Sequence, residues 1–275
     1  MRRNRPLLLL GALILLGFAA CALFPAALAP YAPKQMFAPW LDPCAAHPLG
    51  TNDLGYDVLT ELIYAAGTTL LSGVSAALIS LVVGTAAGLA AGYLPGWRGA
   101  LFGGVIQVFL MIPMLPMAIV VASFAGSSMK SIVLIIALLG WCGTARTVRV
   151  RTMQLRQTPF VESLLILGVP QRRIVLRHVL PNLYEVILSR YIMSVAHCIM
   201  LEATLSFLGM GDPTAVTWGR MINLAYRGGG FTRGAYHWLV SPGACIALVV
   251  IAFYCINQYF EGRSGAVAGG RSYTD

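Results

Sequence analysis

The sequence is poor in charged residues. Only 11% of its residues are Asp, Glu, Lys or Arg, whereas a soluble domain carries about 25%. The hydrophobic share is 58%, and the mean hydropathy is +0.76. So little charge cannot cover the water-facing surface of a 275-residue chain, which excludes a soluble enzyme, a disordered protein and a nucleic-acid-binding domain. The composition is that of an integral membrane protein.

The sequence also lacks the common catalytic and cofactor-binding motifs. A phosphate-binding loop, G-x-x-x-x-G-K-[ST], needs a lysine, and neither Lys34 nor Lys130 stands in such a context. No H-E-x-x-H or G-x-S-x-G segment is present. The six cysteines form no C-x-x-C pair, and all but Cys44 lie in apolar stretches, which predicts neither a zinc site nor a disulfide framework. We therefore expect no enzymatic activity and no cofactor on this chain.

Six apolar runs approach or exceed the roughly 20 residues that a bilayer-crossing helix needs. They cover residues 7–29, 68–93, 100–124, 131–145, 183–208 and 238–260. The third run contains Pro113 and Pro116, and the fourth is the shortest. These runs predict an all-α polytopic membrane protein with six transmembrane helices.

The first run has an alternative reading as a secretory signal. Arg2, Arg3 and Arg5 precede it, and the sequence Ala-Leu-Ala at 27–29 resembles a cleavage site. The apolar core of a signal peptide has about 7–15 residues, which is shorter than this run. We therefore favour an uncleaved first span.

The basic residues predict the orientation, because cytoplasmic segments carry an excess of Lys and Arg. With the N-terminus in the cytoplasm, the inner segments hold Arg2, Arg3, Arg5, Arg98, Arg146, Arg149, Arg151, Arg156, Arg172, Arg173, Arg177, Arg263 and Arg271. The outer segments then hold Lys34, Lys130, Arg220, Arg227 and Arg233. We expect both termini in the cytoplasm. The net charge of +9 is then explained by topology and by anionic lipid headgroups, without a nucleic-acid partner.

This topology divides the chain into four parts. They are an N-terminal tail with the first span (1–29), an outer segment (30–67), a transmembrane core (68–260) with an inner loop at 144–182, and a cytoplasmic tail (261–275). The outer segment is expected to hold one short helix near 57–65. A second outer segment, 212–238, contains three successive glycines at 228–230, which predict a flexible loop.

The inner loop has a pattern of two short helices separated by a turn. Thr158-Pro159 predicts a helix start, and Phe160, Leu164, Leu165 and Leu167 give that helix an apolar face. Gly168 is expected to end it in the left-handed conformation. A second helix is predicted over 171–180, with a break at Pro181-Asn182. Such a loop is either an interfacial amphipathic connector or a docking element for a cytoplasmic partner.

Four segments carry a resemblance to a known family. Glu162, Gly168, Ile174, His178, Leu180-Pro181 and Asn182 resemble the EAA loop of ABC-importer permeases. The segment HPLGTNDLGYD (47–57) resembles the H-P-L-G-T-D-x-L-G-R-D segment of the C-type subunits in the dipeptide, oligopeptide and nickel branch. EATLSFLGMG (202–211) and WGRMI (218–222) resemble two further motifs of that branch. The four occur in the expected order.

Some residues depart from the family pattern. Ser163, Leu164 and Leu165 replace small residues and an arginine of the EAA loop, Tyr56 stands in place of an arginine, and the usual G-D-x-L-R-D ending is absent. The two leucines predict a more apolar docking groove on the partner than is usual.

The resemblance implies a type I ABC importer-like permease in the bacterial inner membrane. It implies four kinds of partner: a second, different permease subunit, two cytoplasmic ATPases that bind ATP and magnesium, a periplasmic or lipid-anchored substrate-binding protein, and membrane lipids. The EAA loop would transmit ATPase movement to the spans. The residues implied in coupling are Phe160, Val161, Glu162, Ser163, Leu164, Leu167, Gly168, Ile174, His178 and Pro181.

The fifth run contains the candidates for the translocation pathway. Met193, His197 and Met200 share one helix face by their spacing, and Glu202 follows them. Methionine and histidine suit transition metals, although methionine is more often an adaptable core residue. The cargo therefore stays open between dipeptides, oligopeptides, nickel and metal chelates. An ion-coupled secondary transporter that uses Glu202 and His197 is the alternative function.

Overall fold

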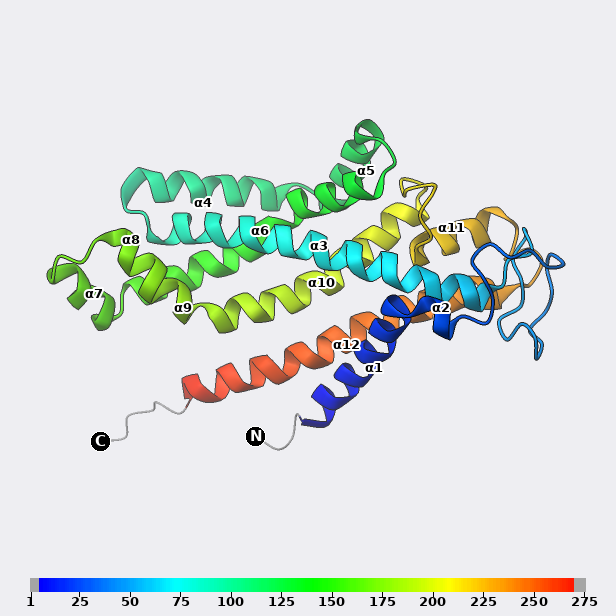
Figure 1. Ribbon diagram of the computed structural model, residues 1–275. Coiled ribbons are helices and arrows are strands. Elements are labelled where there is room, and N and C mark those ends of the chain that lie inside the picture. Colours follow the sequence, from blue (N-terminus) through cyan, green and yellow to red (C-terminus); the bar gives the residue numbers. More distant parts are fainter. Residues whose placement is uncertain (1–4, 270–275) are drawn as a thin grey trace.

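The computed structural model describes residues 5–269, so Arg2, Arg3 and Arg271 lie outside the described residues. The fold is an elongated bundle of helices (Figure 1). Extended backbone pairs within residues 5–269 only at two isolated bridges, Met36 with Tyr56 and Thr51 with Asp57. In chain order the helices are α1 (Arg5–Leu23), α2 (Pro25–Leu28), α3 (Val58–Tyr93), α4 (Gly96–Met111), α5 (Met114–Ala125), α6 (Met129–Arg156), α7 (Pro159–Ile166), α8 (Gln171–Ile174), the π-helix η1 (Val175–Val179), α9 (Leu180–Asn182), α10 (Tyr184–Phe207), α11 (Trp218–Arg227) and α12 (Tyr236–Gly269).

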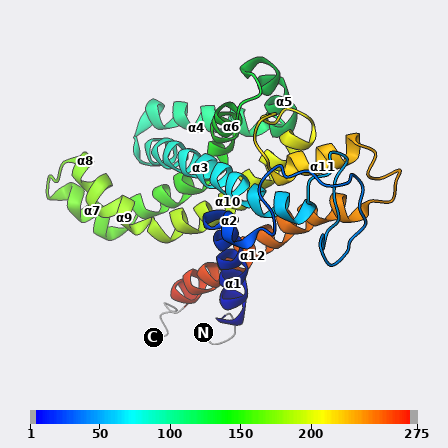
Figure 2. The same ribbon diagram turned by 45° about the vertical axis from the view of Figure 1, so that its right-hand side comes forward.

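Five of these helices are long and apolar enough to cross a membrane: α1, α3, α6, α10 and α12. The bent pair α4 and α5 makes a sixth span if it is counted as one. In both views α1 and α12 lie side by side at one edge of the bundle, and α4 and α5 lie at the other (Figures 1 and 2). The predicted all-α polytopic fold is confirmed.

The third span differs from its prediction as one continuous helix. It is broken between α4 and α5, and the two halves meet at 88°. Pro113 supplies no N–H and adopts an extended conformation (φ −62°, ψ 114°) just before α5, which ends the helix there. Pro116 is tolerated because it lies in the first turn of α5, where the N–H groups have no partner within the helix.

Two helices are longer than their apolar runs. Residues 57–65 were predicted as a separate short helix, but Asp57 is the N-cap of α3, which continues unbroken from Val58 to Tyr93. Similarly, α6 continues past the end of the fourth run to Arg156, so the start of the predicted loop 144–182 is helical. The hydropathy pattern marked where the chain stops being apolar, and the backbone remains helical beyond that point.

The break predicted at Pro181-Asn182 lies one residue later, at Leu183, which separates α9 (Leu180–Asn182) from α10. Proline within an α-helix clashes with the carbonyl group four residues earlier. The chain widens into the π-helix Val175–Val179 before the proline, and the N–H of Leu180 bonds to the carbonyl of Val175, five residues back. This wider turn lets helical backbone run through the proline.

Small residues on α3 set the close approach of α6. Gly84, Gly88 and Gly92 recur at every fourth position, and a Cβ atom added to them would lie 2.6–2.7 Å from backbone oxygens of α6. In membranes, where apolar side chains gain little by leaving lipid, such small-residue contacts let helix backbones pack closely. This packing fixes α6 and the arginines at its inner end against the rest of the bundle.

The second outer segment was expected to be a flexible loop, but it contains α11. Thr217 caps this helix by accepting a hydrogen bond from the N–H of Arg220 at 3.2 Å. Trp218, Met221 and Ala225 are buried at spacings of one helix face. Thr217 before Trp218 and the spacing of the apolar residues could have predicted this helix. The three glycines at 228–230 led instead to the prediction of a loop.

Candidate functional site

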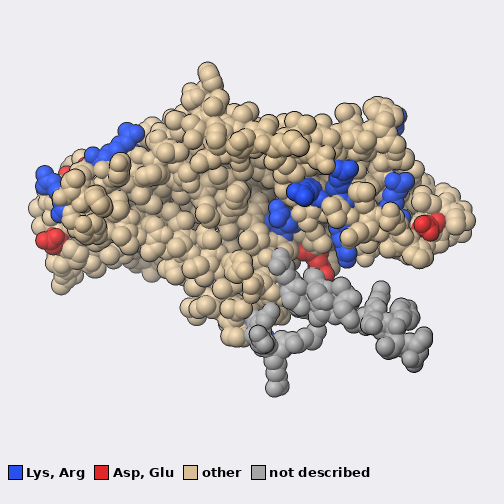
Figure 3. Space-filling view, turned by 180° about the vertical axis from the view of Figure 1, so that it is seen from behind, with Lys and Arg blue, Asp and Glu red and all other residues tan. Residues whose placement is uncertain are grey.

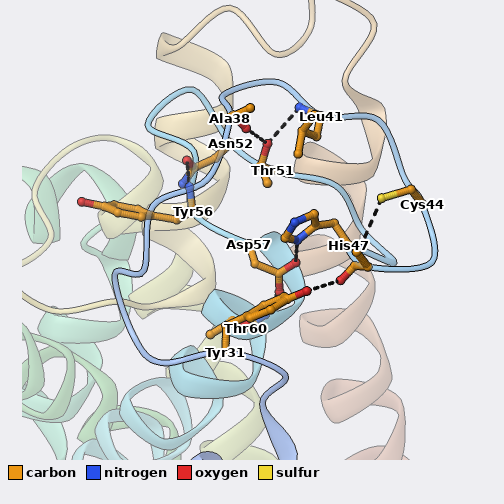
Figure 4. Close-up of polar contacts among 11 residues, drawn as sticks. Tyr31, Ala38, Leu41, Cys44, His47, Thr51, Asn52, Tyr56, Asp57 and Thr60 are labelled. Atoms are coloured by element: carbon orange, nitrogen blue, oxygen red, sulfur yellow. Dashed lines mark hydrogen bonds and ion pairs between the residues drawn. The ribbon is translucent and has the colours of Figure 1, made fainter.

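The outer segment 30–57 forms a hydrogen-bonded cap over the start of α3 (Figure 4). His47 donates from Nδ1 to Asp57 Oδ1 at 2.9 Å, and both side chains are buried. Asp57 Oδ2 accepts from the N–H and the hydroxyl of Thr60, each at 2.8 Å. One carboxylate therefore caps α3 and holds the histidine of the HPLGT segment.

The rest of the same motif holds the loop in place. Thr51 donates its hydroxyl to the carbonyl of Ala38 at 2.7 Å and accepts the N–H of Leu41 at 2.8 Å (Figure 4). Asn52 Oδ1 accepts from the N–H groups of Leu54 and Tyr56, both at 2.9 Å. This motif, singled out by resemblance, thus has a structural role at the outer end of the bundle.

The inner loop places the implied coupling residues on two opposite faces. Val161 and Ile174 are fully buried, and Leu164 packs against the same apolar cluster. These residues hold the loop against α6, so they do not offer contact surface. Ile166 and Leu167 are 87% and 76% exposed. The side chains of Phe160, Glu162 and Ser163 are exposed as well.

Gly168 ends α7 in the left-handed conformation, with φ of 72°, as predicted. Its N–H bonds to the carbonyl of Leu165, and the N–H of Val169 bonds to the carbonyl of Leu164, both at 3.1 Å. These two bonds form a Schellman motif. No neighbouring atom lies within 4 Å of where a Cβ of residue 168 would stand. Only the backbone angle therefore restricts this position.

His178 and Pro181 lie on the returning half of the loop. The His178 ring meets Phe160 of α7 edge-on, with ring centroids 6.1 Å apart. The carbonyl of His178 accepts the Asn182 side-chain amide at 2.6 Å. Pro181 is exposed. His178 therefore connects α7 to the π-helix, which is a structural role.

A cavity of about 410 Å³ opens between the end of α4 and helices α5, α6 and α10. We call it the Met/His cavity, because Met114, Met117, Met193 and His197 line it. Arg190 and Ser194 of α10 also line it. The bend between α4 and α5 and the face of α10 thus bring together methionines from two separate sequence segments.

Two predicted pathway residues lie elsewhere. Met200 is 49% exposed and does not line the Met/His cavity. Glu202 is fully buried, and its Oε1 accepts a hydrogen bond from Ser206 at 2.7 Å. His197 and Glu202 therefore do not share a cavity. Among the side chains of residues 5–260, no group of three His, Cys, Asp or Glu could hold a metal ion.

Two further cavities follow along α6 and were not anticipated. The arginine cavity, about 490 Å³, is lined by Gln107, Arg146, Arg149 and Met153 among others. The loop cavity, about 610 Å³, is lined by Arg149, Met153, Arg156 and Glu162 among others. The sequence placed these arginines on the inner side but gave no sign that they line cavities.

Comparisons with known proteins agree on one family. Residues 84–264 match the model of the binding-protein-dependent transport system inner membrane component. The chain is 33% identical over 264 residues to the oligopeptide transport system permease protein OppC of Mycobacterium tuberculosis, covering 94% of this chain and 88% of the relative. It is 32% identical over 217 residues to the glutathione transport system permease protein GsiD of Pectobacterium atrosepticum, covering 78% and 71%.

A solved structure supports the fold. A chain of the MetNI methionine ABC transporter in an inward-facing conformation matches with a TM-score of 0.59, at 15% identity, over 75% of this chain and 96% of that chain. At this identity the likeness concerns the fold alone.

Proposed function

Because the chain belongs to the binding-protein-dependent transport system inner membrane component family and is a permease subunit of an ABC importer, we propose that it forms half of the path by which peptides cross the inner membrane. The second half would come from a different permease subunit. A periplasmic or lipid-anchored binding protein would deliver the peptide to the outer side.

The exposed apolar end of α7 supports the coupling part of this proposal. Ile166 and Leu167 project from the inner loop, where lipid does not cover them if the loop is cytoplasmic. Glu162 is exposed in the first turn of the same helix and makes no ion pair with another described residue. We assign these side chains to the groove of an ATPase, so that α7 moves with that subunit.

The energy for transport comes from ATP hydrolysis on the partner ATPase subunits. The sequence has no phosphate-binding loop, so two ATPase subunits bind the ATP and the magnesium and this chain binds neither. Closure of the ATPase dimer moves α7, and the Schellman turn at Gly168 passes the movement to α8, the π-helix and α10. The distribution of arginine supports the part of this proposal that has both termini in the cytoplasm.

Peptides are the preferred cargo because the two relatives are named as an oligopeptide and a glutathione transport system permease. Nickel or a metal chelate is the second candidate, and one observation favours it. Met114, Met117, Met193 and His197 share a cavity, and their soft or borderline donors suit transition metals. The ion-coupled alternative has less support, since Glu202 and His197 do not share that cavity.

The test is uptake by the assembled complex in proteoliposomes, with the binding protein outside and ATP inside. We expect ATP-dependent uptake of labelled peptide that is insensitive to a proton uncoupler. Uptake of Ni²⁺ without peptide uptake would move the cargo to metal. Uptake that persists without ATP and stops with the uncoupler would contradict the importer mechanism.

A further inference from the structure

Four arginines line a row of adjacent cavities that ends at the inner loop. The Met/His cavity and the arginine cavity share Leu110. The arginine cavity and the loop cavity share Arg149 and Met153. Arg190 lines the first, Arg146 and Arg149 the second, and Arg149 and Arg156 the third. The row thus carries a guanidinium group in every cavity.

Glycines on the facing helices seat two of these side chains. A Cβ atom at Gly143 of α6 would lie 2.9 Å from an Arg190 terminal nitrogen. A Cβ atom at Gly103 of α4 would overlap the Arg149 guanidinium. Because each facing residue is a glycine, both guanidinium groups come close to the backbone of the neighbouring helix, where any larger residue would collide with them. The grooves are therefore shaped around the cations.

Acidic side chains are scarce among the described residues that line these cavities. Among the described lining residues, Glu162 of the loop cavity is the only acid. The Nε of Arg149 is buried and makes no hydrogen bond with the part of the chain that the structure describes. Arg190 lies within the candidate span α10, where a cation is costly and marks a substrate or ion pathway by default. The described residues therefore leave the Nε of Arg149 without an acceptor, which the carboxylate of a solute can provide.

A view of the opposite side of the molecule agrees with this distribution. Basic side chains gather on the half of that face nearest α7, and few acidic side chains lie among them (Figure 3). A low-dielectric groove lined by one sign of charge concentrates ions of the opposite sign. This row of cavities, taken as part of the translocation path, would therefore attract negative solutes and repel positive ones.

We propose that this row of arginines makes the path selective for acidic peptides, with Arg190 as the first contact and Arg146 and Arg149 as the next toward the cytoplasm. The proposal rests on the proposed function, since it names the class of peptide carried. Arginine recognises carboxylate through two parallel N–H···O bonds, which a neutral or basic side chain cannot replace.

The spacing suits the handover of a short peptide. Arg190 reaches α6 at Gly143. Arg149 lies six positions further along α6, a rise of about 9 Å along the helix axis. An extended tripeptide spans roughly 10 Å. One carboxylate can thus leave Arg190 while another already meets Arg146 or Arg149, so the peptide need not lose all its contacts at once.

The experiment compares three labelled peptides, Ala-Glu-Ala, Ala-Ala-Ala and Ala-Lys-Ala, in proteoliposomes that contain the full complex and its unmodified binding protein. Each peptide is supplied at a concentration that gives equal occupancy of the binding protein, measured by calorimetry. Differences in uptake then arise in the membrane path. The variants are Arg190→Gln, Arg190→Lys and Arg146→Gln/Arg149→Gln, with Arg98→Gln as a control because Arg98 is exposed and lines none of the three cavities.

We expect wild-type uptake in the order Ala-Glu-Ala, Ala-Ala-Ala, Ala-Lys-Ala. Loss of a charge-assisted bond predicts that Arg190→Gln lowers Ala-Glu-Ala uptake about tenfold or more, with little change for Ala-Lys-Ala. Arg190→Lys should keep part of the preference, and Arg98→Gln should keep all of it. An equal fall for all three peptides in the Arg190 and Arg146/Arg149 variants, or an unchanged ratio, would overturn the inference while wild-type uptake still supports the proposed function. Absence of ATP-dependent uptake of every peptide by the wild type would remove both.

Discussion

His47 and Asp57 are joined by a buried hydrogen bond of 2.9 Å between Nδ1 and Oδ1, and the same aspartate caps α3 through Thr60. The HPLGT segment is therefore tied to the start of α3. The motif's place in the fold is structural, because it fixes the outer segment on the end of α3.

The first prediction concerns this cap. Asp57→Ala removes both the cap and the partner of His47, and loss of an N-cap costs about 1 kcal/mol. Asp57→Asn keeps an oxygen that can cap Thr60 but loses the charge. We expect Asp57→Ala to lower the thermal unfolding temperature in detergent more than Asp57→Asn does. Equal stability of Asp57→Ala and the wild type would show that the cap contributes nothing.

A second prediction follows from a contact between loops far apart in sequence. Asp212 accepts hydrogen bonds from the Thr214 hydroxyl and N–H, and from the N–H of Met129 at the start of α6. The bonds from Thr214, followed by that from Met129, lower the pKa of Asp212. Its stabilising effect is thus present above the unfolded pKa of about 3.9 and is lost as the pH falls through the lowered folded value.

The measurement compares wild type with Asp212→Asn by thermal unfolding across this range. We expect Asp212→Asn to be less stable near neutral pH. The gap should close in acid as the wild-type carboxylate becomes protonated. A gap that stays constant down to the lowest pH at which the protein folds would contradict the assignment.

A third prediction concerns the WGRMI segment. A Cβ atom at Gly219 would lie 2.5 Å from the Cα and the carbonyl oxygen of Ala203 in α10, which are backbone atoms that cannot move aside. Gly219→Ala should therefore separate α11 from α10 and destabilise the protein. Gly104→Ala is the matched control, because nothing lies within 4 Å of its Cβ position, and replacing a helical glycine there should stabilise by about 0.5–1 kcal/mol. Similar unfolding temperatures for the two variants would refute this packing account.

Much of this fold follows from the sequence, because long apolar runs have few alternatives to a membrane helix. The bend at Pro113 was harder to foresee, since proline also occurs in continuous membrane helices. The helix α11 was missed because Gly228, Gly229 and Gly230 drew attention to flexibility, whereas its buried face begins at Trp218. The hydropathy pattern located the helices more accurately than it located their first and last residues.

The candidate sites were foreseen less completely. Gly168 was predictable because a glycine after a short helix usually closes it. The division of the loop residues into buried Val161 and Ile174 and exposed Leu167 depends on how the loop packs on α6, which the sequence does not state. The Met/His cavity combines α5 with α10, so the spacing within one helix wrongly grouped Met200 with Met193 and His197.

A fourth prediction tests the docking surface. The exposed Cys44 is first replaced by serine. Ser163→Cys should then crosslink to an ATPase subunit, because residue 163 of α7 is exposed. Val161→Cys should not, since Val161 is fully buried. Thr214→Cys, in the outer segment, provides the opposite control. Crosslinks from residue 163 to the binding protein, and none to an ATPase, would reverse the proposed orientation.

The central claim, that α7 and its turn couple ATP hydrolysis to peptide passage, is tested most directly by the number of ATP molecules hydrolysed per peptide imported. The comparison is between wild type, Gly168→Val and Gly168→Asn in the assembled complex. A left-handed residue other than glycine costs about 1–2 kcal/mol, and asparagine tolerates this conformation best. Space around the position is open, so the backbone angle alone separates the two variants. We predict normal insertion for both, near-normal coupling for Gly168→Asn, and hydrolysis with little or no import for Gly168→Val. Import by Gly168→Val at the wild-type ratio would contradict the account.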